Sequence, residues 1–288
     1  MKIFYHIVIT ISVFFMNKKI GLVVALVFVA LFVMGTASAG FLDFLGGGSQ
    51  GTNDENTFIV GFDAEFPPYG YKDDSGNYTG FDLDLAKEVC ERNNWTFQAQ
   101  PIDWDAKDAE LESGSIDCIW NGFTIDGREN DYLWSNPYFD NKQIFVVKEG
   151  SGVSSIDDLA GKTVETQKDS SALAALQGDN KTIADTFGTL TEVADYNTAF
   201  MDLESGACDA VAMDIGVAEY DIDQKNNTDD YSILDQEITT EKYGIGFKKG
   251  NDALKDQVQK TLDEMFKDGT VLKIAEKYGI SEDALIQP

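Results

Sequence analysis

Histidine, arginine and cysteine are scarce in this chain of 288 residues. The only histidine is His6, and it precedes a long apolar segment. The rest of the chain therefore offers no imidazole for a catalytic triad, a general base or a histidine metal site. The three cysteines, Cys90, Cys118 and Cys208, are far apart and form no CxxC pair, which disfavours a disulfide framework or a thiolate zinc site. We expect them to be small buried apolar residues.

Positive charge is also scarce. Lysine and arginine total 22 against 50 aspartate and glutamate, so the formal net charge is −28. A chain this acidic repels phosphate backbones and anionic membrane surfaces, and we expect no nucleic-acid partner. Hydrophobic residues make up 43% of the sequence, which is enough for a globular core. The length allows one large domain or two medium ones.

Residues 1–39 read as a signal peptide. They contain no acid, and Lys18 and Lys19 precede an apolar run that ends at Met34, followed by Ala37-Ser38-Ala39. The run is short for a membrane span, although an uncleaved anchor is the alternative. Met16 is a second possible start. Residues 40–57, rich in glycine and then in polar residues, read as a flexible linker.

The remaining chain alternates short apolar strands with amphipathic helices, which predicts an α/β fold. The expected strands cover 58–62, 97–102, 116–120, 143–148, 163–166, 210–213 and 244–248, and the expected helices cover 82–93, 106–112, 171–177, 196–204, 215–220, 252–267 and 271–278. A Leu-Glu-Ser-Gly sequence precedes a short strand at 111–114 and again at 203–206. This repeated sequence indicates two similar lobes with a cleft between them, or it reflects only the helix-turn-strand pattern that is common in α/β proteins.

One of the two arginines is the most informative residue. Arg128 follows the strand that ends at Trp120-Asn121-Gly122-Phe123-Thr124, in a chain that otherwise uses lysine almost throughout. Guanidinium offers a planar fork for a carboxylate, which lysine cannot copy. The alternative is a surface ion pair with Glu129 or another nearby acid. For Arg92, near a helix end, we expect a solvated role.

Other polar and aromatic residues follow predicted strands. Ser170 and Ser171 open a helix, where they bind an anion or cap the helix. Asp214 precedes a helix as an N-cap or as a partner for an ammonium group. Of the aromatic residues near strand ends, we place Phe66 and Trp104 around a ligand side chain. No P-loop, GxSxG, HExxH or complete calcium loop is present, so we predict no catalytic residue, no metal and no cofactor.

Several stretches together resemble the extracytoplasmic amino-acid-binding proteins of ABC importers (solute-binding protein family 3, the type II periplasmic-binding-protein fold). The resemblance covers about residues 56–281, and the stretches that carry it are Gly80–Ala86, Gly122–Ile125 with Arg128, Gly161–Val164, Tyr243–Phe247 and Asp268–Thr270. The sequence departs from the family pattern at two places. The Thr124–Arg128 spacing is one residue short, and Asp169 stands where the family has glycine.

The resemblance implies two α/β lobes joined by two hinge strands, near 138–142 and 239–243, around a central ligand cleft. Lobe 1 would comprise 58–138 plus 243–288, and lobe 2, inserted between them, 139–242. It implies that Arg128 pairs with the ligand α-carboxylate and that Asp214, helped by the Gly122 carbonyl, takes the α-ammonium. The other matched ligand-binding positions are Thr124, Ser170, Ser171, Asp63, Phe66 and Trp104.

The predicted function is capture of a polar L-amino acid by lobe closure, without chemistry. Asp63, with Glu65 close by, favours an amide or basic side chain, so glutamine, lysine, arginine and histidine stay open. The partners would be a membrane permease and its separate ATPase, and we expect a monomer. The alternatives are a membrane-tethered sensor domain or a lyase (dehydratase) on the same fold.

Overall fold

The computed structural model describes residues 56–224 and 229–287. The predicted signal peptide and all but the last two residues of the predicted linker lie outside this part. The helices are α4 (Phe81–Asn93), α5 (Lys107–Ser113), α6 (Ser171–Gln177), α7 (Lys181–Ala184), α8 (Tyr196–Ser205), α9 (Ile215–Gln224), α10 (Asp252–Lys267) and α11 (Thr270–Lys277), with 3-10 turns at Trp104–Ala106, Ile156–Leu159 and Glu282–Ala284. None of the described helices has the length and apolar character that crossing a membrane requires.

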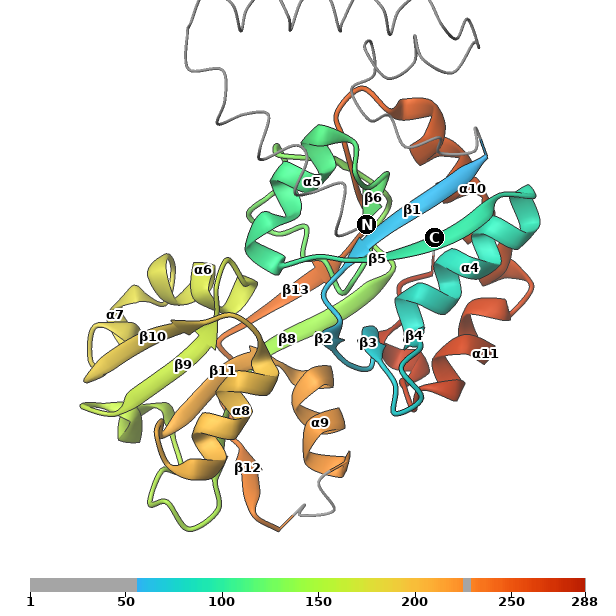
Figure 1. Ribbon diagram of the computed structural model, residues 1–288. Coiled ribbons are helices and arrows are strands. Elements are labelled where there is room, and N and C mark those ends of the chain that lie inside the picture. Colours follow the sequence, from blue (N-terminus) through green and yellow to red (C-terminus); the bar gives the residue numbers. More distant parts are fainter. Residues whose placement is uncertain (1–55, 225–228, 288) are drawn as a thin grey trace, which may run out of the picture. The chain divides into compact units, whose positions relative to one another are not determined.

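One lobe is built on a mostly parallel sheet with the strand order β5-β1-β6-β14-β7. Its strands are β1 (Thr57–Phe62), β5 (Thr96–Pro101), β6 (Cys118–Ile119), β7 (Leu133–Trp134) and β14 (Gly246–Phe247). The short strand β14 runs antiparallel to both of its neighbours, β6 and β7. Figure 1 shows α4, α10 and α11 grouped on this lobe, so the C-terminal helices return to the sheet on which the described chain begins.

The other lobe is built on a sheet with the order β10-β9-β11-β8-β12, and β13 pairs with β8 beside this path. Its strands are β8 (Phe139–Lys148), β9 (Thr163–Gln167), β10 (Thr189–Val193), β11 (Ala210–Asp214), β12 (Tyr231–Ile233) and β13 (Thr239–Tyr243). β9, β10 and β11 are parallel, and helices α6, α7 and α8 lie around them in Figure 1. The fold is therefore α/β in both lobes, as predicted.

The two lobes are linked by a pair of antiparallel strands. Residues 139–143 of β8 pair with residues 239–243 of β13, and Figure 1 shows both strands running from one lobe into the other. These are the two segments predicted as hinges. The precise residues at which the lobes begin and end stay a prediction, because extended strands continue through both crossings.

The sequence of α4 explains how the first lobe packs. Leu83, Leu85, Ala86, Val89 and Cys90 are all buried on this helix. Its spacing of apolar residues therefore places a continuous apolar stripe against the sheet.

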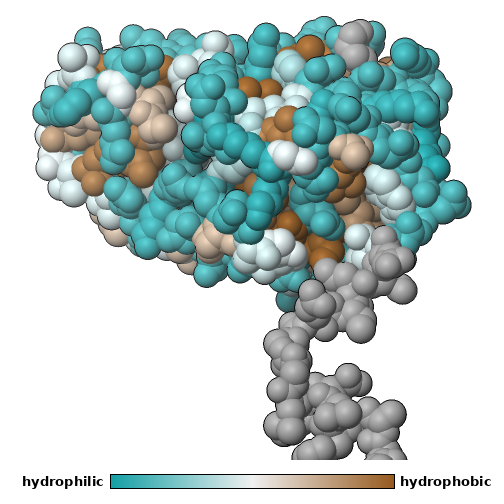
Figure 2. Space-filling model, turned by 90° about the horizontal axis from the view of Figure 1, so that it is seen from above, coloured by the Kyte–Doolittle hydropathy of each residue, from teal (hydrophilic) through white to brown (hydrophobic). Residues whose placement is uncertain are grey.

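All three cysteines are buried and free, as the sequence predicts. The surface seen in Figure 2 is mostly hydrophilic with separate apolar patches, which agrees with the acidic composition.

The predicted helices coincide with observed ones, although α9 continues four residues beyond its predicted end and the short α7 was not predicted. Several strands were also missed. A small sheet of β2 (Glu65–Phe66), β3 (Gly70–Lys72) and β4 (Tyr78–Thr79) forms where the sequence indicates only loop and turn. Strands of two or three residues are too short to show an alternating pattern. Strands β7, β10 and β12 were also missed, whereas β13 was expected only from the family resemblance, as a hinge strand.

The buried carboxylate of Asp82 makes the stability of the fold depend on pH. Its carboxylate is fully buried at the start of α4, where it accepts hydrogen bonds from Gly122 N (2.6 Å) and Tyr138 OH (2.8 Å). Burial raises the pKa of Asp82 to about 7, although both hydrogen bonds oppose this rise. Between pH 4 and pH 7 the folded protein therefore holds a proton that the unfolded chain has released. The stability from this proton is lost as the pH rises through 7.

We therefore expect the free energy of unfolding of the ligand-free protein to fall from pH 5 to pH 8, with about 2–4 kcal/mol of the fall due to Asp82. Urea unfolding at each pH measures this. Asp82→Asn should reduce the fall, since the amide does not titrate there. Its oxygen can accept from Gly122 N, and the Tyr138 hydroxyl can turn to accept from its NH₂ group. Asp84→Asn, on the same helical turn, is the control and should keep the wild-type slope. An unchanged slope in Asp82→Asn would place the proton elsewhere.

Candidate functional site

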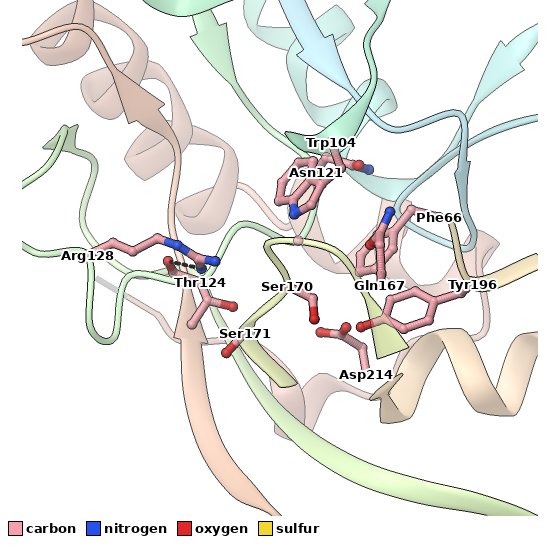
Figure 3. Close-up of a pocket in the computed structure, with 11 residues that line it drawn as sticks. Phe66, Trp104, Asn121, Thr124, Arg128, Gln167, Ser170, Ser171, Tyr196 and Asp214 are labelled. Atoms are coloured by element: carbon pink, nitrogen blue, oxygen red, sulfur yellow. Dashed lines mark hydrogen bonds between the residues drawn. The ribbon is translucent and has the colours of Figure 1, made fainter. Parts of the chain in front are cut away.

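A cavity lies between the two lobes and is lined from both. From the first lobe it is lined by Phe66, Trp104, Asn121, Gly122, Thr124 and Arg128, and from the second by Gln167, Ser170, Ser171, Tyr196 and Asp214. Figure 3 shows that these side chains converge from loops and helix starts at strand ends. The cavity thus occupies the edge where α/β sheets commonly bind ligands.

The structure brings together eight of the nine residues predicted from the sequence: Phe66, Trp104, Gly122, Thr124, Arg128, Ser170, Ser171 and Asp214. The ninth, Asp63, lines an adjoining groove that shares Trp104 with the cavity. Its carboxylate accepts a 2.6 Å hydrogen bond from Gln167 Nε2, so it contacts the cavity wall through that amide. The individual roles of the nine predicted residues toward a ligand stay predictions.

Arg128 supplies a positive charge that is not neutralised within the described part of the chain. It forms no ion pair there, and its guanidinium donates to the carbonyl oxygens of Asp169 (2.9 Å) and, at 3.4 Å, of Thr124. Its own carbonyl accepts from Trp134 Nε1 at 3.0 Å, which holds the loop. A guanidinium has five N–H donors, so several remain for an anion. The predicted alternative, an ion pair with Glu129, is not formed.

The position where glycine was expected has a left-handed backbone. Asp169 has a φ of 53°, a region that favours glycine, so the substitution preserves the backbone path expected before the two serines. Its side chain forms an ion pair with Lys107 of α5, whose ammonium is buried and lies 5.1 Å from the centre of the Trp104 ring. Asp169 thus contributes an ion pair between the lobes. Ser170 caps α6 through a 3.1 Å bond from Leu173 N.

Asp214 provides a buried carboxylate on the second lobe, at the end of β11. Three donors converge on its Oδ1: Asn141 Nδ2 at 2.7 Å, Gln143 Nε2 at 2.8 Å and Tyr243 OH at 2.5 Å. No hydrogen bond within the described residues ends on Oδ2, and Figure 3 shows the carboxylate beside the Tyr196 hydroxyl at the cavity. Burial first, and then the charge of Glu241, raise the pKa of Asp214 to about 7.

Glu241, a buried residue of β13, was not among the site residues predicted from the sequence. Its Oε1 accepts from Asn141 Nδ2 and Gln143 Nε2, both at 2.8 Å, and from the Thr124 hydroxyl at 3.0 Å. Its other oxygen accepts from the Ser171 hydroxyl. Both hydroxyl hydrogens therefore point at Glu241. To donate to a ligand carboxylate, as the resemblance implies, Thr124 and Ser171 would first have to leave it.

Gly122 is a backbone position with no space for a side chain. Its φ is 55°, and a Cβ here would lie 2.7 Å from the Phe66 ring. Its N–H is fixed by Asp82, as described above. The carbonyl of Gly122 therefore has a defined place beside Phe66, and any larger residue would displace that ring from the cavity.

The end of the cavity near Asp63 is acidic. Asp63 is 7% exposed, and burial raises its pKa to about 6 against the hydrogen bonds from Glu65 N and Gln167. The charges of Asp195 and Glu65 raise it further.

Three residues that line the cavity were not predicted: Gln167, Asn121 and Tyr196. A neutral amide at a strand and a tyrosine in an amphipathic helix carry no signal of their own in one sequence.

Two hinged α/β lobes, with a cavity lined by both, define a two-lobe ligand receptor. The family model for bacterial extracellular solute-binding proteins, family 3, matches residues 58–281. The chain therefore belongs to that family. Its relatives include the L-cystine-binding protein TcyJ of Escherichia coli K12, 29% identical over 232 residues (78% of this chain and 83% of TcyJ). A probable histidine-binding protein of Neisseria gonorrhoeae is 31% identical over 237 residues (80% and 85%).

Solved structures give the same result. The substrate-binding protein of an ABC uptake transporter from Streptococcus pneumoniae, with bound histidine, has a TM-score of 0.77 at 32% identity, covering 81% of this chain and 95% of that one. An ancestral arginine-binding protein bound to glutamine has a TM-score of 0.70 at 37% identity, covering 77% and 97%. The predicted family and two-lobe fold are thus confirmed.

Proposed function

We propose that this protein is the extracytoplasmic substrate-binding subunit of an amino-acid ABC importer. The observation that carries this proposal is the pair of opposite charges in one cavity, Arg128 on the first lobe and Asp214 on the second. A zwitterion needs one cationic and one anionic partner. When the lobes close, water is excluded and both ion pairs strengthen. The ligand α-carboxylate would bind Arg128, and the α-ammonium would bind Asp214 and the Gly122 carbonyl.

The side chain of the ligand would extend between Phe66 and Trp104 toward Asp63 and Gln167. Two aromatic faces suit an extended aliphatic chain or a planar group, and a cation gains further from their quadrupole. An acidic far end suits an amide or basic group. Glutamine, arginine, lysine and histidine are therefore the favoured ligands, and relatives described as binding arginine, histidine and glutamine support this range.

The partners would be a membrane permease with its separate ATPase, acting on the closed, loaded form of a monomer. The N-terminal signal segment would export the protein to the periplasm or cell surface, or tether it if uncleaved. An enzymatic role is the second candidate because one structural neighbour is the ancestral amino-acid-binding protein AncCDT-1, a precursor of cyclohexadienyl dehydratase. The absence of a histidine after residue 39 disfavours that chemistry.

A thermal-shift screen of the protein against the twenty amino acids tests the proposal. A ligand at 100 times its Kd should stabilise the protein by about 2.7 kcal/mol, which corresponds to a rise in Tm of roughly 5–10 °C. We expect shifts confined to amide and basic amino acids. Titration calorimetry then gives Kd, and NMR of the recovered ligand checks that it is unchanged. No shift with any amino acid would contradict the proposal, and conversion of the ligand would favour the enzyme.

A further inference from the structure

Two buried carboxylates share their hydrogen-bond donors beside the cavity. Asn141 Nδ2 and Gln143 Nε2 each contact both Asp214 Oδ1 and Glu241 Oε1, at 2.7–2.8 Å. The two acidic oxygens are therefore held close together by two bridging amides. Both residues are only 4% exposed. Two ionised carboxylates at such a distance, out of water, repel each other strongly.

No cation within the described residues offsets this pair. Neither carboxylate lies within ion-pair distance of a lysine or arginine there. The other titratable groups that face the pair are the hydroxyls of Tyr243, Tyr69 and Tyr196, whose pKa values are raised by burial, so they stay neutral. Arg128 lines the same cavity, but its guanidinium is directed at carbonyl oxygens. Glu219, on α9 behind Tyr69, is a further acid.

We propose that Asp214 and Glu241 hold one proton between them in the ligand-free protein, and that the ammonium group of the bound amino acid displaces it into solvent. This inference rests on the proposed function. In the free protein the shared proton removes the repulsion between the two oxygens. In the complex the ammonium supplies the positive charge instead, so both carboxylates ionise. Capture of a zwitterion is then an exchange of one cation for another, and the released proton passes to the buffer.

The sign of the pH dependence follows from this exchange. The bound state holds one proton fewer, so acid favours the free protein. Where the pair is protonated, Kd should rise about tenfold for each unit by which the pH falls. Between about pH 5.5 and 6.5, free glutamine and arginine keep both main-chain charges, because this range is well away from the pKa values of their carboxyl and amino groups. Any proton released in that range therefore comes from the protein, which makes these two amino acids suitable probes.

The decisive experiment is calorimetry of L-glutamine and L-arginine in buffers of different ionisation enthalpy, at pH 6 and pH 8. The wild type should release close to one proton per ligand at pH 6 and much less at pH 8. Glu241→Gln should release much less than the wild type at pH 6. The variant keeps the contacts of Oε1, and the Ser171 hydroxyl can turn to accept from the new amide. Glu165→Gln, a buried glutamate of β9 away from the cavity, is the matched control and should behave like the wild type.

A ligand-free measurement separates this inference from the proposed function. The shared proton stabilises the folded protein at acid pH, so Glu241→Gln should reduce the loss of stability between pH 5 and pH 8, whereas Glu165→Gln should not reduce it to the same extent. If no amino acid binds, the proposed function fails while this arm still reports on the pair. Tight binding without proton release would overturn the inference. So would a Glu241→Gln variant that matches the wild type both in proton release and in the pH dependence of its ligand-free stability.

Discussion

Replacing Arg128 with alanine is expected to weaken amino-acid binding by about 100-fold to 1,000-fold and to leave the fold intact. Removing one partner of a buried charge pair costs about 2–5 kcal/mol, because the other charge is left unpaired in a site without water. Here that charge is the ligand α-carboxylate. Within the described residues the guanidinium bonds to two carbonyl oxygens and lies 5.4 Å from the centre of the Phe123 ring. Its loss should therefore shift the Tm of the free protein by no more than about 2 °C.

The chain supplies its own control for this experiment. Arg92, the other arginine, lies outside the cavity and pairs with Glu88 and Asp268 near the surface. Arg92→Ala should keep the wild-type Kd. Arg128→Lys adds a further comparison, because it retains the charge and loses the fork, and its affinity should fall between those of the wild type and alanine. A Kd for Arg128→Ala within about tenfold of the wild-type value would refute the carboxylate role.

Replacing Asp214 with asparagine is the second large effect that we expect. The amide oxygen can keep the three hydrogen bonds that converge on Oδ1, so the local structure should survive. The position of Oδ2 becomes an NH₂ group, which faces the ligand ammonium as a donor. Loss of the ion pair together with this mismatch should raise Kd at least about 100-fold.

The same substitution should leave the free protein at least as stable at pH 8. A buried carboxylate with a raised pKa is costly to ionise, and asparagine avoids that cost. Calorimetry gives Kd, and urea unfolding at pH 8 gives the stability. Asp223→Asn, an exposed acid on α9, should change neither quantity. Retained affinity in Asp214→Asn would remove the ammonium role from this residue.

Most helices could be predicted from the sequence to within a residue or so, because their apolar spacing and capping signals are local. Helix α10, for example, occupies the predicted range 252–267. The exceptions are α7 (Lys181–Ala184), which was not predicted, and α9, which runs to Gln224 instead of ending at 220. The strands β2, β3 and β4 could not be predicted, since each gains its definition from pairing with its neighbour rather than from its own pattern. Pairing of β13 with β8 joins residues about 100 positions apart, and no local signal reports it.

Some residues of the candidate site could likewise be predicted from the sequence, and others could not. Arg128 was found because arginine is rare here, and Asp214 because it ends a buried strand. Glu241 was missed because it lies in a polar segment that does not read as buried. Its spacing of two residues from Tyr243 was the available clue, because alternate residues of a strand face the same side and Tyr243 is fully buried. The family resemblance already implied a hinge strand near 239–243, so this alternation could have been applied to it.

The three buried cysteines make this protein well suited to optical detection of its ligand. Burial raises the pKa of Cys90 and of Cys208 to about 12, and it holds the pKa of Cys118 well above its usual range. Thiol reagents at neutral pH should therefore leave all three cysteines unmodified. A single cysteine introduced at an exposed rim position, such as Lys168, would then be the only reactive thiol. A fluorescent dye attached there would sit at the mouth of the cleft and report its closing.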